Sequence, residues 1–184
     1  MFKNLCLSAT FAALSFASLA ASTDKIAAIQ SNIAHIEQAK TDSLFELKTS
    51  IEIANQALQH FQSKLGDNFE SSRNHVLSLL NTLMESEEFA FTLNDVTDRY
   101  VDYVVNQNMN FNDIVIDASD YPLEGRIEAI FTAASPALDA QTYQMFDVFY
   151  VTIAIMRSAE LFCAKLDLKK DALLAEIATL EATN

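Results

Sequence analysis

Apolar residues recur every three or four positions over more than forty residues near the start of the chain. This spacing keeps them on one face of a helix. The stripe consists of Ile26, Ile29, Ile33, Ile36, Lys40, Leu44, Leu47, Ile51, Ala54, Leu58, Phe61 and Leu65. It predicts one straight helix from about Thr23 to Leu65, capped at its start by residues 22–24 and ended by Gly66. Residues 41–43 offer a cap for a second helix, but the unbroken phase favours one.

A second apolar stripe follows and then changes direction. Its first part consists of Phe69, Val76, Leu79, Leu80 and Leu83. Its second part, rotated by about half a turn, consists of Leu93, Val96, Tyr100, Tyr103 and Val104. One helix cannot face two ways without a break, so we expect a kink or loop between Glu85 and Phe91. Thr92 and Asp95 have the spacing of a capping box and predict where the helix restarts.

The segment from Asn106 to Tyr121 has no helical period and is rich in Asn and Asp. It predicts a long loop with one short strand-like piece. Pro122 is expected to open a short helix to about Thr132. Ser135 followed by Pro136 predicts the start of a last helix, which keeps one phase to about Leu180. Its first half is apolar nearly all round, so it is either surrounded by protein or exposes a patch.

These elements predict an all-α protein: an elongated antiparallel bundle of three long helical arms, the middle one broken, plus one short helix. The chain of 184 residues contains two glycines and two prolines. A β-sandwich or a dinucleotide-binding α/β fold needs many more turn glycines, so the composition argues against both.

The first residues have the pattern of a secretory signal peptide. Lys3 precedes an uncharged apolar stretch that ends in small residues at Ala20 and Ala21. We expect cleavage after residue 21, a single domain at 22–184, and a secreted protein, extracellular or periplasmic; a retained anchor helix is the alternative. Cleavage would leave Cys163 alone, either as a buried inert thiol or in an intermolecular disulfide.

The chain has 12 basic and 25 acidic side chains and a formal net charge of −13. Nucleic-acid binding needs clustered Lys and Arg, so the charge argues against it, and no segment predicts a membrane span. The three histidines lack metal-site spacing, and glycine-rich phosphate loops and nucleophile motifs are absent. We therefore expect no cofactor and no catalytic chemistry.

Two groups of residues are candidates for binding. Apolar side chains that could line a cavity between the arms are Phe89, Phe91, Phe131, Met145, Phe149, Ile153 and Met156. Glu160 projects onto the same sector; it is either a carboxylate in that cavity or half of a packed ion pair with Arg99 or Arg126. The loop carboxylates of Asp113, Asp117 and Asp120 are a weak calcium candidate, although the EF-hand pattern fails and a solvated loop explains them as well.

Two functions remain open. The first is a secreted acidic bundle that acts by binding another protein or itself, or as an extracellular structural component. The alternative is a secreted carrier of apolar ligands, such as lipids, in a cavity between the helices. The sequence favours the first, because aromatic stripes at helical spacing are usually plain core.

Overall fold

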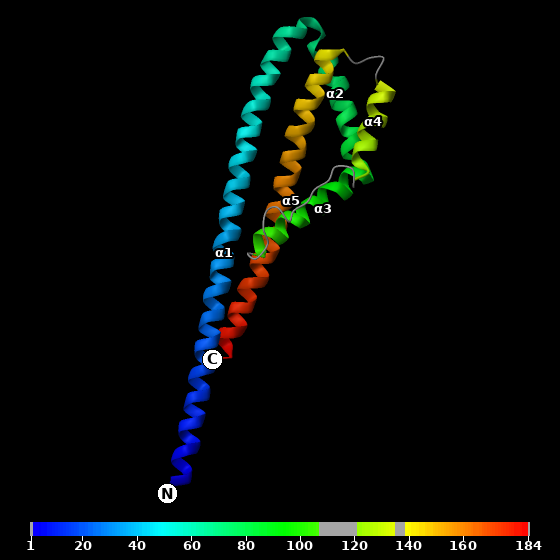
Figure 1. Cartoon of the computed structure of the whole chain (residues 1–184). Helices are drawn as coiled ribbons and strands as arrows, with labels where there is room; N and C mark the ends of the chain where they lie inside the picture. The colour runs from blue at the N-terminus through cyan, green and yellow to red at the C-terminus, as the bar shows by residue number, and fades with distance from the viewer. Residues whose placement is uncertain (1, 107–120, 135–138, 184) are drawn as a thin grey trace.

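The computed structural model describes the backbone of residues 2–106, 121–134 and 139–183, and the side chains of these ranges from Ser22 onward. Within them every regular element is a helix, and long helices pack against one another (Figure 1). This confirms the all-α bundle that the sequence predicts.

The first long helix, α1, spans Phe2–Leu65. It passes through residues 41–43 without interruption, so the single helix favoured by the apolar phase is confirmed. It ends where predicted: Gly66 follows with a φ of +54°, a left-handed backbone conformation that glycine adopts without a steric penalty. The predicted cap at residues 22–24 is wrong, because these residues lie inside the continuous helix.

The middle arm consists of a 3₁₀ turn, η1 (Gly66–Asn68), followed by α2 (Phe69–Met84) and α3 (Glu87–Val105). The break falls inside the predicted interval. Thr92 is not the cap, because it lies within α3. Ser86 has that role: its backbone is extended, and its hydroxyl oxygen accepts a hydrogen bond from the amide of Phe89 at 3.2 Å. The cap forms at the extended residue between α2 and α3, six residues before Thr92.

The remaining helices are α4 (Leu123–Ala134) and α5 (Ala140–Ala182). The helix after Pro122 is confirmed and ends two residues beyond the predicted Thr132. The predicted long loop falls almost wholly outside the described residues, as do Ser135 and Pro136. The helix α5 itself begins four residues after Pro136, and Asp139 caps it by accepting a hydrogen bond from the amide of Thr142 at 2.7 Å.

The helix α5 is central and packs against α1, α2 and α3. It runs antiparallel to α1, since the ion pairs Lys25–Glu176 and Lys40–Asp167 join rising numbers on α1 to falling numbers on α5. Two groups of buried residues hold the bundle. The upper cluster consists of Phe61, Phe69, Val76, Leu80, Leu83, Phe89, Ile130, Met145 and Phe146. The lower cluster consists of Ile36, Val101 and Leu166.

Between these clusters lies a stretch that we call the waist, residues 37–60 of α1 and 147–158 of α5. No side chain in either segment is buried. From Ile36 to Phe61 this covers about 37 Å of helix. In Figure 1 the two helices lie close together at the lower end and diverge towards the upper end. The apolar stripe of α1 continues through the waist, but Leu44 is 55% exposed and Ile51 is 38% exposed.

Candidate functional site

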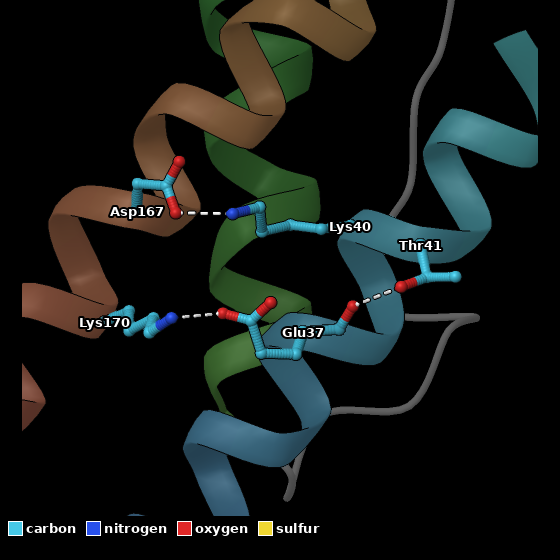
Figure 2. A network of polar contacts seen from close by, with 5 residues as sticks. All are labelled: Glu37, Lys40, Thr41, Asp167 and Lys170. Atoms are coloured by element: carbon cyan, nitrogen blue, oxygen red, sulfur yellow. Dashed lines mark hydrogen bonds and ion pairs between the residues drawn. The ribbon is translucent and has the colours of Figure 1, made fainter.

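A network of charged side chains joins the lower end of the waist on α1 to the part of α5 just beyond it (Figure 2). Glu37 and Lys40 lie one turn apart on α1 and face Lys170 and Asp167 on α5. Lys40 Nζ lies 2.5 Å from Asp167 Oδ1, and Lys170 Nζ lies 2.5 Å from Glu37 Oε1. The hydroxyl of Thr41 donates to the backbone oxygen of Glu37. Each charge has an opposite partner, so the network links the two helices.

The pKa values in this network follow from the pairing. The hydrogen bond from Lys170 lowers the pKa of Glu37, and the hydrogen bond to Asp167 raises the pKa of Lys40. Both shifts favour the charged forms at neutral pH. A carboxylate with a lowered pKa is a poor proton acceptor near pH 7, and an ammonium with a raised pKa is a poor proton donor. The two ion pairs therefore stay charged and connect α1 to α5.

A groove of about 600 Å³ opens at the waist, between α1, α3 and α5; we call it the waist groove. Its apolar lining includes Val96, Tyr100, Tyr103, Val104, Ile155 and Phe162. Asp42 and Glu46 of α1 lie on its wall, and its lining contains no Lys, Arg or His. A groove of this kind suits an apolar segment that carries positive charge at its edge.

A second groove, of about 610 Å³, lies between α3, α4 and α5; we call it the aromatic groove. Five aromatic side chains line it: Tyr121, Phe131, Tyr143, Phe146 and Tyr150. The ring centroids of Phe131 and Phe146 are 4.6 Å apart with an edge-to-face geometry, and those of Phe131 and Tyr143 are 4.9 Å apart. Burial raises the pKa of the Tyr150 phenol, which therefore stays neutral over the physiological range.

A hydrogen bond between Tyr121 and Asp95 fixes one wall of the aromatic groove. Tyr121 is buried, and its hydroxyl donates to Asp95 Oδ2 on α3 at 2.7 Å. That hydrogen bond, together with one from Arg99, lowers the pKa of Asp95. The residues just before α4 are thereby attached to α3.

The predicted apolar-ligand residues do not line one cavity. Met145 and Phe89 are buried in the upper cluster, and Phe149 and Ile153 pack partly buried against it. Phe131 lines the aromatic groove. Phe91 and Met156 are exposed. Met145, Phe149, Ile153 and Met156 all lie on α5, but neighbouring helices cover different parts of its surface.

Glu160 is exposed and forms an ion pair with Arg157, one turn away on α5, at 3.2 Å. The predicted partners are wrong: Arg99 pairs with Asp95 instead, at 2.9 Å. Together with Phe89, Glu160 lines a third, shallow groove between α5 and the break of the middle arm. Its position on α5 turns the carboxylate to solvent, where no buried partner is needed.

The calcium candidates Asp113, Asp117 and Asp120 lie outside the described residues. In the described ranges no three His, Cys, Asp or Glu side chains come together as a metal site. Cys163 is a free thiol, and partial burial raises its pKa. No helix in the described part of the chain has the length and apolar character needed to cross a membrane.

Sequence reasoning missed most of the aromatic groove. Tyr143, Asp147 and Tyr150 share one face of α5 with the buried Phe146, a spacing that could have marked a polar-edged aromatic surface. By itself, an aspartate at position 147 indicates only a solvated edge of the helix. Nothing in the sequence near Tyr121 indicates that it meets this face, because the hydrogen bond to Asp95 spans 26 positions.

The chain was compared with protein-family models, with curated proteins and with solved structures, and none of these comparisons gives a match.

Proposed function

We propose that the protein is a secreted interaction protein that binds an amphipathic helical segment of another protein in the waist groove. One observation carries the proposal: apolar side chains of α3 and α5, among them Tyr103 and Ile155, line the waist groove and are only partly buried. An apolar groove of this kind favours a partner that fills it.

The charges favour a partner with basic residues. Asp42 and Glu46 line the waist groove, and no basic side chain lines it. The formal net charge of −13 also makes a second copy of the chain a poor occupant, because two such copies repel one another. A helix with an apolar stripe flanked by Lys or Arg matches both features.

The alternative function, a carrier of apolar ligands, has weaker support. Its proposed residues divide between the upper cluster, the grooves and the exposed surface. The proposal assigns no catalytic chemistry. Export rests on the pattern of residues 1–21, and the intact mass of the protein recovered from a periplasmic or extracellular fraction tests it. We expect the mass of a chain that begins near Ser22. The mass of a chain that still contains Lys3 would contradict export with cleavage.

The binding surface is tested with a fluorescent amphipathic helix of leucine and lysine, about 18 residues long. Fluorescence anisotropy measures its affinity for the wild type and for the variant Y103S/I155S. We expect about tenfold weaker binding by the variant, because both side chains line the waist groove. The matched control is L168S/L174S, which removes two exposed leucines of α5 beyond the waist.

Three results would contradict the proposal. Equal affinity of the Y103S/I155S variant and the wild type would place the contact elsewhere. Equal affinity for the same peptide with glutamate in place of lysine would contradict the role given to Asp42 and Glu46. A dimer in sedimentation experiments that Y103S/I155S abolishes would make a second copy the occupant.

A further inference from the structure

The aromatic groove combines an aromatic lining with negative charge. Its apolar lining is largely aromatic, and its charged residues are acidic. Glu124 and Glu128 lie on α4 and Asp147 lies on α5 across the groove; all three are exposed. The lining contains no Lys, Arg or His. The electrostatic potential in this groove is therefore negative.

In the absence of a ligand, the three carboxylates of the aromatic groove repel one another. Glu124 and Glu128 are four residues apart on α4, a spacing that brings like charges together on one face and destabilises a helix slightly. Asp147 adds a third negative charge from the facing helix. Arg126, on the same helix, lies about half a turn away and does not line the groove. A bound cation would relieve this repulsion.

The aromatic rings select among cations. A positive charge is attracted to the face of an aromatic ring, and the attraction is strongest for weakly hydrated organic cations in a partly desolvated site. Tyr143 is 46% exposed, whereas Phe146 is 1% exposed, so the groove has an open aromatic wall and a closed aromatic floor. Its volume of about 610 Å³ is that of a small-molecule site.

From this arrangement we infer that the aromatic groove binds a small organic cation with an apolar body, such as a substituted quaternary ammonium. The apolar body packs on the partly buried Phe131 and Tyr150, and the cationic group lies between Tyr143 and the three carboxylates. The inference is independent of the proposed partner site, because the waist groove lies between α1, α3 and α5 and shares only Val96 with this lining.

The test uses benzyltrimethylammonium and its uncharged isostere neopentylbenzene, which have the same shape. Ligand binding is followed by NMR chemical shifts of the protein. We expect the cation to bind about tenfold more tightly than the isostere, because only the cation gains from the ring faces and carboxylates. Raising the salt concentration to about 0.5 M should weaken binding of the cation but not binding of the uncharged isostere.

Two variants separate the contributions of charge and ring. E124Q/E128Q/D147N keeps the shape of the groove and removes its charge, and about tenfold weaker binding of the cation is expected. The matched control E52Q/D171N/E181Q removes three exposed carboxylates elsewhere and should leave binding unchanged. Y143L removes the open aromatic wall and should lower the affinity for the cation about threefold. Circular dichroism verifies that each variant stays helical, and the single change D147N serves if the triple variant does not.

The inference is overturned if neopentylbenzene binds as tightly as the cation, which would make the groove a site for neutral apolar ligands. It is also overturned if the control triple variant weakens the cation as much as the groove variant does, since the attraction would then come from the net charge. Absence of binding at millimolar cation would overturn it directly. None of these results bears on the leucine and lysine peptide, whose site is tested by Y103S/I155S.

Discussion

The two ends of the bundle are held by different interactions. The upper cluster buries nine apolar residues from α1, α2, α3, α4 and α5, and the partly buried Phe131 packs edge-to-face against Phe146. The lower cluster buries only Ile36, Val101 and Leu166, and ion pairs between α5 and its neighbours surround it. Lys165 of α5 adds a pair with Asp98 of α3 at 2.6 Å. Five helices contribute to the upper cluster and three to the lower one, so the two ends differ in the number of helices that cover the core.

This difference determines how each end responds to its surroundings. Apolar burial is insensitive to salt and to pH near neutrality, whereas partly exposed ion pairs are screened by salt and depend on ionisation. The upper end should therefore contribute most of the free energy of unfolding. The stability of the lower end should depend more on salt concentration and pH. The waist between them has no buried side chain that couples the two.

The largest effect is expected from F146A at the upper end. Phe146 is 1% exposed, and removing its ring leaves a cavity, so the free energy of unfolding should fall by about 3–5 kcal/mol. Urea denaturation measures the change. F91A is the matched control, because Phe91 is 57% exposed and should cost far less. Equal losses would contradict the assignment of the upper core.

A smaller loss is expected from L166A at the lower end. Leu166 is fully buried, but it has only two buried apolar partners, so the loss should be about 2–3 kcal/mol. Faster hydrogen exchange should be confined to the lower parts of α1, α3 and α5. L168A, two residues away at an exposed position, is the control. Faster exchange throughout the upper cluster would show that the two ends unfold together.

The ion pairs should have a still smaller effect. D167N removes the partner of Lys40, and we expect Tm to fall by about 1–3 °C at low salt and by less at high salt. Asp171 forms no ion pair within the described residues, so D171N is the matched control. A decrease in Tm that is unchanged in high salt would mean that packing, and not charge, holds this contact.

The smallest effect is a pH dependence confined to the lower end. The pKa of Glu37 is lowered from its ordinary value of 4.5, so its contribution is present above pH 4.5 and is lost as the pH falls through the lowered value. The pKa of Lys40 is raised from 10.5, so its contribution is present below pH 10.5 and is lost as the pH rises through the raised value.

The difference in Tm between the wild type and E37Q should therefore be constant between about pH 5 and pH 10 and vanish in acid. Circular dichroism melting curves measured across this range test it. E52Q, at an exposed position of α1, should show no such difference at any pH. A difference that grows as the pH falls below 4.5 would contradict the role given to Lys170.

The sequence could predict most of the fold but little of the candidate sites. Gly66 marked the end of α1, and the change of phase after Leu83 marked the break of the middle arm. Both are local signals, since helix ends and apolar phase depend on neighbouring residues. The cap at Ser86 was missed, because serine is common and only the extended backbone at that position shows its role. The pairing of Glu160 with Arg157, three residues before it on α5, was missed, because Glu160 was expected to face the interior and to need a partner from another helix.

The sequence by itself determined the helices and their apolar stripes, because hydrogen bonds four residues apart and side-chain period are properties of the chain. Only the tertiary structure decided which parts of each stripe are covered. Ile36 and Leu44 belong to the same stripe of α1, yet α3 and α5 bury the first and leave the second exposed. Coverage depends on how α1 and α5 diverge, and that geometry depends on contacts between residues far apart in the chain (Figure 1).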